Sequence, residues 1–171
     1  NLTYRPLKKI SRSRIAPTEN DQFLRKQILI GYTHDEMACF AGGVEGNAGL
    51  FGNANDLVKL LQLYLNRGEY GGERYIGEKT ADLFIRSKTP ASRRGLGFDK
   101  PDVVHPEKSP TCKEAPASVF GHTGYTGGCF WVDPDHELVY IFLCNRVYAH
   151  RWNNNLMKLN VRPEIQSVIY R

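Results

Sequence analysis

Two strand-like runs joined by a short turn constrain most strongly how this chain can fold. The first run is "GCFWV" (128–132), the second is "ELVYIFLCN" (137–145), and "DPDH" lies between them. Pro134 suits the second position of a type I turn, so the runs are predicted to pair as an antiparallel hairpin. The stretch Leu138–Cys144 is apolar throughout, which is typical of a strand buried on both faces. With the preceding extended segment "SVFGHTGYTG" (118–127), the hairpin predicts a three-stranded antiparallel meander.

Segments with helical periodicity surround this meander. Between Asn53, which can cap a helix, and Gly68, which can end one, apolar residues recur at helical spacing. These residues, which we expect in the core, are Leu57, Leu60, Leu61, Tyr64 and Leu65. A second helix is predicted over 78–87 and a third over 152–171, where Pro163 suits a first helical turn.

The remaining segments are predicted to be loops or short extended pieces. Residues 1–20 lack periodicity and are expected to form a loop, and the glycine-rich residues 41–52 a tight one. The β-branched and aromatic residues of "QILIGYT" (27–33) favour an extended segment. "RRGLGFD" (93–99) predicts a short strand, and the proline-rich residues 100–117 predict an irregular surface loop. The fold class is α+β, with helices packed on an antiparallel sheet.

The composition excludes several classes of function. The 171 residues are 41% hydrophobic and 24% charged, as in ordinary soluble globular proteins. Basic residues are scattered, and the net charge of +5 is modest, so we expect no nucleic-acid partner. No apolar run approaches the roughly 18 residues of a membrane span. The four cysteines are widely spaced, and the histidines lack a metal-ligand spacing, so neither a metal nor a cofactor is expected.

The pair His122–Thr123 is the first candidate for chemistry because glycines frame it. Gly121, Gly124 and the glycines that follow remove bulk from one strand edge, so backbone N–H groups can approach a ligand. Thr123 adds a hydroxyl, and His122 adds a donor that becomes cationic at mildly acidic pH. Such donors suit a carboxylate or a developing oxyanion. The alternative is a glycine-rich bend at a sheet corner, and the spacing does not decide between the two.

His34 is the second candidate, because Asp35 and Glu36 follow it directly. Such a cluster can be a ligand set, or a base with an orienting carboxylate. The alternative is a hydrogen-bonded loop. We therefore treat His34 and Asp35 as possible cleft residues. The other three histidines, which we expect at the surface without a role, are His105, His136 and His150.

Four blocks of sequence, in order, carry a resemblance to a known family. They are "GNAGLFGNANDLVKLLQLYL", "GGERYIGEKTADLF", "RGLGFDKPD" and "FGHTGYTGGCFWVDP". Together they resemble the C-terminal half of the serine β-lactamase and penicillin-binding-protein-like hydrolases, in the esterase and class C-like branch. The chain is most similar to the β-lactamase-like module that follows a family-3 glycoside hydrolase module of the β-N-acetylglucosaminidase type. Residues 1–171 would then be a single partial domain.

The resemblance implies roles for the residues of the glycine frame. In the family, a Lys-Thr-Gly or His-Thr-Gly triplet lies on the strand that borders the active site. His122 would tune the charge near the substrate, and Thr123 would bind a substrate carboxylate or acyl side chain. The backbone N–H of Tyr125, after Gly124, would form half of the oxyanion hole. The other half would be the N–H of the nucleophile.

The family's nucleophile motif, however, is missing from the sequence. In the family a serine lies in Ser-x-x-Lys, yet none of the serines here is followed three residues later by lysine. Tyr64-Leu65-Asn66 matches the companion Tyr-x-Asn motif by letters, but it closes a predicted helix and is interpreted as chance. The nucleophile, its lysine base and the companion tyrosine are therefore expected upstream of Asn1, in the same polypeptide, because a nucleophile and its base must lie within hydrogen-bond reach.

Two hypotheses about function follow. In the first, the parent hydrolyses an amide or ester of a cell-wall-derived or β-lactam-like substrate, and the chain alone is inactive. In the second, the chain is a non-catalytic module that binds a glycan or peptide ligand for an adjoining glycosidase, with Tyr125 and Trp131 as a platform. We also expect self-association through exposed sheet edges. From the resemblance alone, an extracytoplasmic location in a bacterium is expected.

Overall fold

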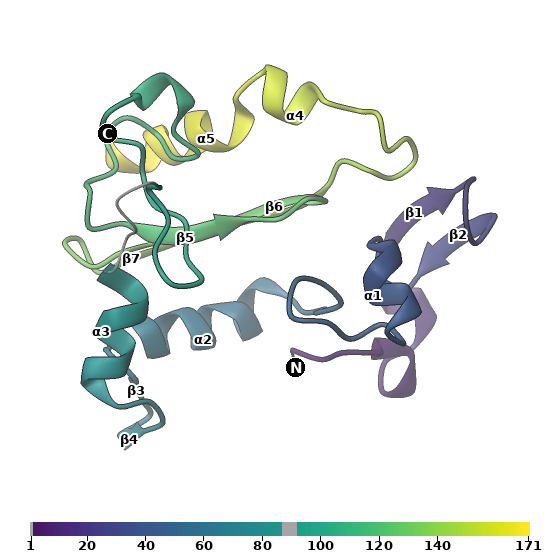
Figure 1. The fold of residues 1–171 in the computed structure, drawn as a ribbon, viewed down its shortest axis with the longest axis horizontal. Helices are drawn as coiled ribbons and strands as arrows, with labels where there is room; N and C mark the ends of the chain where they lie inside the picture. The colour runs from purple at the N-terminus through teal and green to yellow at the C-terminus, as the bar shows by residue number, and fades with distance from the viewer. Residues whose placement is uncertain (1, 87–91) are drawn as a thin grey trace.

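The computed structural model describes residues 2–86 and 92–171, and its centre is a three-stranded antiparallel sheet (Figure 1). The strands are β5 (Phe120–Thr123), β6 (Gly127–Asp133) and β7 (Leu138–Asn145), in the order β5-β6-β7. Successive strands pair through tight turns, so the predicted meander is confirmed. Helices cover both faces of the sheet, which confirms the α+β expectation.

One face of the sheet packs on two helices that lie below it in Figure 1, α2 (Ala54–Leu65) and α3 (Glu78–Arg86). Asn53 caps α2 as predicted, since its side chain accepts a hydrogen bond from the Asp56 N–H at 2.9 Å. The buried residues of this layer are Leu61, Ala81, Ile85, Phe120 and Val132. Of the predicted core stripe, Leu60 was placed wrongly: it lies at the flank of the apolar stripe and is 38% exposed. Ser87, predicted as the end of α3, lies outside the described residues.

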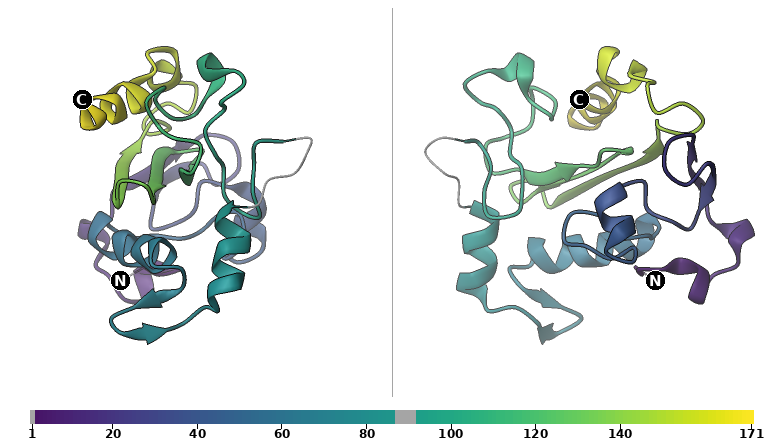
Figure 2. Two further views of the ribbon diagram at one scale, coloured as in Figure 1. Left: turned by 90° about the vertical axis from the view of Figure 1, so that its left-hand side faces the viewer. Right: turned by 45° about the vertical axis from the view of Figure 1, so that its right-hand side comes forward.

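The other face packs on the C-terminal helix α5 (Val161–Tyr170), which follows the single turn α4 (Asn155–Lys158) (Figure 2). Pro163 lies in the first turn of α5, as predicted. Trp131 and Tyr140 form the centre of this layer, and the segment between α3 and β5 closes it: the Cys112 N–H donates to Gln166 Oε1 at 3.0 Å.

A second, smaller unit precedes α2 and contradicts the prediction that residues 1–20 form only a loop. Two short 3-10 helices (Pro6–Lys8 and Arg12–Arg14) lead into β1 (Pro17–Asp21), which pairs with β2 (Gln27–Ile30). Asn1 lies outside the described residues. β1 escaped prediction because its buried side chains are polar ones, Thr18, Glu19 and Asp21, so no apolar alternation marks it.

The helix α1 (Glu36–Phe40) and the two-residue strands β3 (Glu69–Tyr70) and β4 (Glu73–Arg74) complete the regular elements, with a 3-10 turn at Pro106–Lys108. Residues 41–52 form the predicted glycine-rich loop. The hairpin β1–β2 and α1 lie at the end of the sheet from which β6 starts, to the right in Figure 1. This arrangement brings the N-terminal segment to the glycine-framed turn between β5 and β6.

Two further expectations about strands were wrong. Residues 93–99 contain no strand and contribute one bridge, in which Asp99 pairs with Gly121 of β5. β7 is not buried on both faces: Leu143 is 54% exposed, because β7 is the edge of the sheet among the described residues. Neither described range contains a helix long and apolar enough to cross a membrane.

Gly121 fixes the position of the strand that carries the His-Thr pair. A Cβ atom at this residue would collide with the Phe130 carbonyl oxygen and would lie 2.5 Å from Trp131 Cε3 of β6. On its other edge, Gly121 exchanges two backbone hydrogen bonds with Asp99, at 2.7 and 3.0 Å. Only glycine lets β5 approach β6 this closely.

Candidate active-site edge

The glycine-framed motif lies at the surface, at the turn where β5 ends and β6 begins. His122 and Thr123 are half-buried, and Gly124 and Tyr125 are exposed. The Gly124 N–H donates to the Gly128 carbonyl at 2.7 Å, and the Gly127 N–H donates to the Gly124 carbonyl at 3.0 Å. The turn is therefore closed by its own backbone, and its four candidate residues remain accessible from one side.

The backbone N–H of Tyr125 is a free donor held in a fixed turn. Within residues 2–86 and 92–171, nothing accepts a hydrogen bond from it. The Tyr125 carbonyl, by contrast, accepts from Arg146 Nε at 2.9 Å, and the Arg146 guanidinium lies 4.6 Å from the centre of the tyrosine ring. A preorganised N–H without an acceptor is the type of group that stabilises a developing oxyanion.

Both ring nitrogens of His122 are engaged. Nδ1 lies 2.7 Å from the Thr123 carbonyl oxygen, which can only accept, so Nδ1 carries a proton. Nε2 lies 3.1 Å from Arg94 Nη1. Arg94 thus places a positive charge directly beside the His122 ring.

Arg94 adds a net positive charge beside β5. The buried Asp99 carboxylate is bound bidentately by Arg93, at 2.8 and 2.9 Å, and Arg94 lies 3.6 Å from the same group. Two guanidinium groups thus share one carboxylate, and Arg94 is half-exposed. Sequence reasoning missed Arg94 because it treated the Arg93–Arg94 pair as scattered surface charge.

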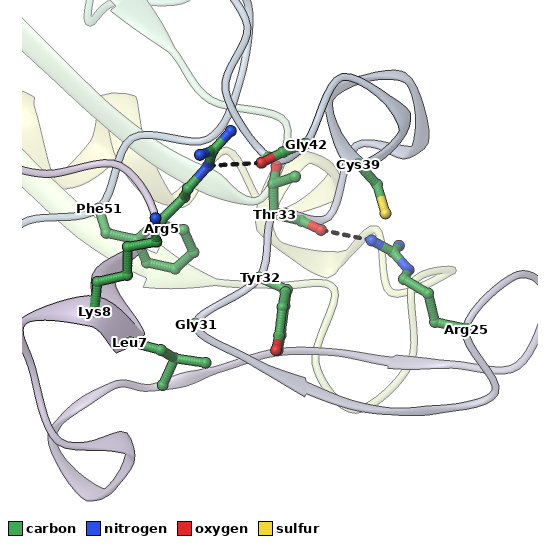
Figure 3. Close-up of a pocket in the computed structure, with 11 residues that line it drawn as sticks. Arg5, Leu7, Lys8, Arg25, Gly31, Tyr32, Thr33, Cys39, Gly42 and Phe51 are labelled. Carbon is green, nitrogen blue, oxygen red and sulfur yellow. Dashed lines mark hydrogen bonds between the residues drawn. The ribbon is translucent and has the colours of Figure 1, made fainter.

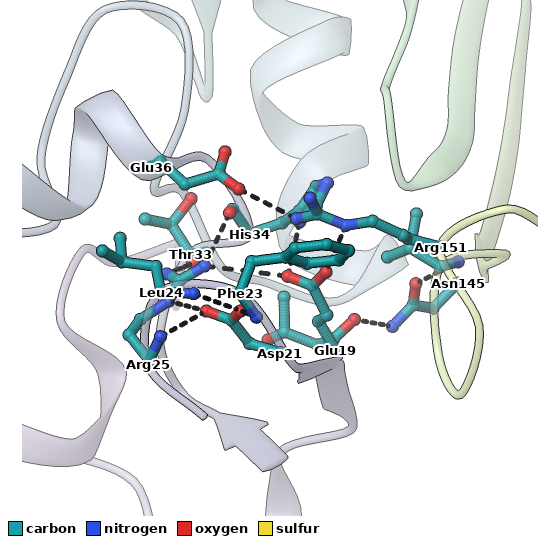
Figure 4. A network of polar contacts seen from close by, with 12 residues as sticks. Glu19, Asp21, Phe23, Leu24, Arg25, Thr33, His34, Glu36, Asn145 and Arg151 are labelled. Carbon is teal, nitrogen blue, oxygen red and sulfur yellow. Dashed lines mark hydrogen bonds and ion pairs between the residues drawn. The ribbon is translucent and has the colours of Figure 1, made fainter. Parts of the chain in front are cut away.

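The structure brings the two candidate groups of the sequence together. The His34 ring stacks on the Tyr125 ring, with centroids 4.9 Å apart and an interplanar angle of 23°. His34 is 8% exposed, and its Nδ1 lies 2.8 Å from Oε2 of Glu19, a buried residue of β1 (Figure 4). Glu19 was not singled out in the sequence, because β1 itself was not predicted.

Asp35 has a different task from its neighbour. Its Oδ1 accepts a hydrogen bond from the Ala38 N–H at 2.8 Å, so it caps the short helix α1. Glu36 turns to Arg151 Nη2 at 2.9 Å. The run His34–Asp35–Glu36 is therefore not a shared ligand set, and no group that could hold a metal ion occurs in the part of the chain that the structure describes.

A network of charges fixes the N-terminal unit below His34 (Figure 4). Arg151 Nε binds Glu19 Oε1 at 2.6 Å, and this hydrogen-bonded guanidinium lowers the pKa of Glu36. Burial alone would raise the pKa of Asp21, but the Arg25 side chain and three backbone N–H groups hold it well below its usual range. Two arginines thus neutralise buried carboxylates that no apolar core could hold.

A cavity of about 430 Å³ is lined by residues of the segment before α2 (Figure 3). Leu7, Tyr32 and Phe51 contribute apolar side chains, and Arg5, Lys8 and Arg25 contribute positive charge. Its described lining residues include no carboxylate. Thr33 also lines the cavity and directly precedes His34, whose ring stacks on Tyr125 of the glycine-framed turn.

Comparison with known proteins places the chain in a family. The family model described as Beta-lactamase matches residues 3–158. The chain belongs to the beta-lactamase family. D-alanyl-D-alanine carboxypeptidase-like proteins of Salmonella paratyphi B and Salmonella newport are each 34% identical to it over 128 residues, which are 74% of this chain and 29% of the relative. The chain thus spans less than a third of the length of these beta-lactamase-family relatives.

A solved structure shows the same fold. The crystal structure of a beta-lactamase from Mycobacterium bovis superposes with a TM-score of 0.54 at 18% sequence identity, over 71% of this chain and 44% of that one. The β5–β6–β7 sheet with helices on both faces is thus a beta-lactamase-like arrangement.

Proposed function

We propose that the chain forms one edge of the active site of a serine hydrolase that cleaves an amide or ester through an acyl-enzyme. The observation that carries the proposal is the backbone N–H of Tyr125, which has no acceptor in the described ranges, while the Tyr125 carbonyl is held by Arg146. In the first step, a serine oxygen would attack the substrate carbonyl, and the N–H would stabilise the negative oxygen. The amine or alcohol then leaves, and water releases the acid.

The charge at β5 supports a substrate that carries a carboxylate. Arg94 contributes a half-exposed positive charge, and Thr123 adds a half-buried hydroxyl at the same strand end. The related Salmonella proteins are named for D-alanyl-D-alanine, whose terminal group is a carboxylate. We therefore infer that a cell-wall-derived peptide is a better substrate than an uncharged ester.

The nucleophile and its base would come from a segment outside residues 1–171. None of the serines in the sequence is followed three residues later by lysine, and no side-chain base is hydrogen-bonded to the Thr123 hydroxyl in the described ranges. In the described ranges β7 is an edge of the three-stranded sheet, so a further strand could pair with it. Self-association through this edge, an extracytoplasmic location and an adjoining glycoside hydrolase module remain predictions.

A ligand-binding module without chemistry is the second possibility. It needs exposed aromatic side chains, and Tyr125 is 64% exposed. Trp131, however, is 1% exposed and packs in the core, so it cannot form part of a binding platform. With half of the expected platform buried, the hydrolase is favoured.

Hydrolysis assays test the proposal. The chain of 171 residues alone should not turn over nitrocefin, p-nitrophenyl esters or a peptide ending in D-alanyl-D-alanine. The longer polypeptide that contains it should hydrolyse at least one of them, and a serine-to-alanine change in an upstream Ser-x-x-Lys motif should abolish turnover. Turnover by the 171 residues alone, lost on mutation of a serine within them, would contradict the division of roles.

A further inference from the structure

We propose that Glu19 and His34 form a positioning pair that holds Tyr125, and with it the backbone N–H at the end of β5, in the orientation required for catalysis. The inference rests on the proposed function, since it assigns an additional role within the same site. It gives a function to the N-terminal unit, whose Glu19 and His34 lie far from Tyr125 in the sequence.

Tyr125 is exposed yet held from several sides. At 64% exposure, a tyrosine in a two-residue turn would ordinarily change rotamer freely, since little packing restrains it. Here the His34 ring stacks on it, and Arg146 binds both its carbonyl oxygen and its ring. The Arg146 N–H also donates to the Thr126 carbonyl at 2.7 Å. These contacts fix the two peptide units that follow the Tyr125 N–H, and the Gly127 N–H, which donates to the Gly124 carbonyl at 3.0 Å, fixes the peptide unit that contains it.

His34 can hold the ring because its own orientation is fixed. The Glu19 carboxylate can only accept, so the 2.8 Å contact requires a proton on His34 Nδ1. Because this nitrogen carries a proton, it cannot accept a hydrogen bond from Arg151 Nη2, which lies 3.4 Å away. The Arg25 guanidinium donates to the His34 carbonyl at 3.0 Å. Both the ring and the backbone of His34 are thereby anchored.

Burial makes this anchor rigid. Glu19 is 1% exposed, and its second oxygen binds Arg151 Nε at 2.6 Å, so it cannot turn away from His34 without breaking a buried ion pair. Arg151 is held in turn by Glu36 at 2.9 Å. A rigid carboxylate that orients a histidine, which then fixes a third group, is a recurrent way to preorganise donors in active sites.

Kinetics of the longer polypeptide test the proposal through His34→Leu, which removes the ring, and His34→Phe, which keeps a flat ring against Tyr125. Misplacing an oxyanion donor lowers kcat more than it changes KM, because the donor acts on the transition state. We expect His34→Leu to lower kcat on the order of tenfold, with KM changed less than about twofold. His34→Phe should retain most of the rate. Tyr125→Ala should match His34→Leu, and the double variant should lose no more than either one.

A matched control is available in His136, whose Nδ1 also lies 2.8 Å from a buried carboxylate, that of Asp133. It lies at the turn between β6 and β7, so His136→Leu should leave kcat unchanged. An unchanged kcat in His34→Leu, or losses that multiply in the double variant, would overturn the proposal. Equal loss in His34→Leu and His136→Leu would also overturn it, because the effect would then be general destabilisation.

Backbone relaxation of the 171-residue chain separates failure of this inference from failure of the proposed function. The Tyr125 amide should show an order parameter near the roughly 0.85 of rigid backbone, and His34→Leu should lower it toward about 0.6. A polypeptide without hydrolase activity, but with this change at Tyr125, would refute the function and keep the positioning pair. An order parameter that is low in the unmutated chain, or unaffected by His34→Leu, would refute the pair.

Discussion

Two groups of the same three side-chain types occur at opposite ends of the β6 strand. In one, which we call the cleft cluster, His34 lies 2.8 Å from Glu19 and stacks on Tyr125. In the other, the turn cluster, His136 lies 2.8 Å from Asp133 and meets the ring of Tyr170 edge-on, at 5.7 Å and 86°. Each joins a histidine, a buried carboxylate and a tyrosine.

The two clusters differ in which member faces the solvent. In the cleft cluster, His34 is buried and Tyr125 is exposed, whereas in the turn cluster His136 is exposed and Tyr170 is half-buried. The Tyr170 hydroxyl donates to Asp133 at 2.6 Å, and burial together with this hydrogen bond raises the pKa of Tyr170.

The comparison shows what distinguishes a structural cluster from one that can serve a reaction. In the turn cluster, the Tyr170 hydroxyl and His136 Nδ1 are both hydrogen-bonded to the Asp133 carboxylate. These two bonds connect α5 to the turn between β6 and β7. In the cleft cluster, the hydrogen bonds end at His34, whose ring stacks on Tyr125, and the Tyr125 N–H has no acceptor in the described ranges. The predictions below separate these two tasks.

The largest effect is expected from Glu19→Ala in the cleft cluster. This change leaves His34 and two arginines without their shared buried carboxylate, and breaking a buried ion pair typically costs about 3–5 kcal/mol. The free energy of unfolding, measured by urea denaturation, should fall by that amount. Glu107→Ala, at an exposed glutamate, is the control and should change it by less than about 0.5 kcal/mol. A loss of under about 1 kcal/mol for Glu19→Ala would show that the network is not needed for folding.

Acid should destabilise the protein through one carboxylate near each cluster. Asp21, beside the cleft cluster, has a pKa below its usual value, and so does Asp133, whose hydrogen bonds from Tyr170 and His136 outweigh its burial. Because the folded pKa is depressed, their contribution is present above about pH 4 and is lost as the pH falls below it. Each carboxylate can contribute at most about 1.4 kcal/mol per pH unit to the slope.

Denaturation curves between pH 5 and 2 check this prediction. Asp21→Asn should remove one carboxylate's share of the slope, and Asp133→Asn should remove the other. If neither variant flattens the dependence of the unfolding free energy on pH, the acid sensitivity comes from other carboxylates.

A smaller effect is expected from Tyr170→Phe in the turn cluster. The change removes the hydroxyl that donates to the Asp133 carboxylate, and a hydrogen bond to a charged group contributes about 2 kcal/mol. Thermal or urea unfolding should register this loss, whereas kcat of the longer polypeptide should not change. A fall in kcat would show that the turn cluster also shapes the active site.

The smallest effect is expected from His136→Ala. The His136 side chain is 60% exposed, and exposed ion pairs contribute about 0–1 kcal/mol. Urea denaturation should therefore barely distinguish this variant from the original chain, while His34→Ala should lose more, because its ring fills a buried position. Equal losses for the two histidines would remove the distinction between the clusters.

Much of the central fold could be predicted, because periodicity and nearby turn or capping residues determine β5, β6, β7 and α2. The Asn53 cap and the pairing of β6 with β7 depend on a few neighbouring residues, and both are as expected. β1 could not be predicted, since Pro17 and Asp21 are rare in strands and its buried side chains are polar. Its stability comes from arginines elsewhere in the chain, which periodicity does not reveal.

The candidate site could be predicted only in part, for a similar reason. His34 and Tyr125 were each notable for their neighbours in the sequence, but nothing there indicated that their rings stack. The contact between His122 and Arg94 was equally hidden, because Arg94 approaches from a segment predicted as a strand. These features depend on contacts between segments that lie far apart in the sequence. A single sequence shows the residues but not which of them meet.

The absence of room for a Cβ atom at Gly121 has a consequence for how such a protein can diversify. Wedged against Phe130 and Trp131, β5 cannot slide or tilt to present His122 and Thr123 differently. New substrate preferences would therefore have to arise from substitutions at neighbouring positions without this steric constraint, such as the exposed Arg94. The sequence of β5 would then stay the same, while neighbouring residues change the substrate preference.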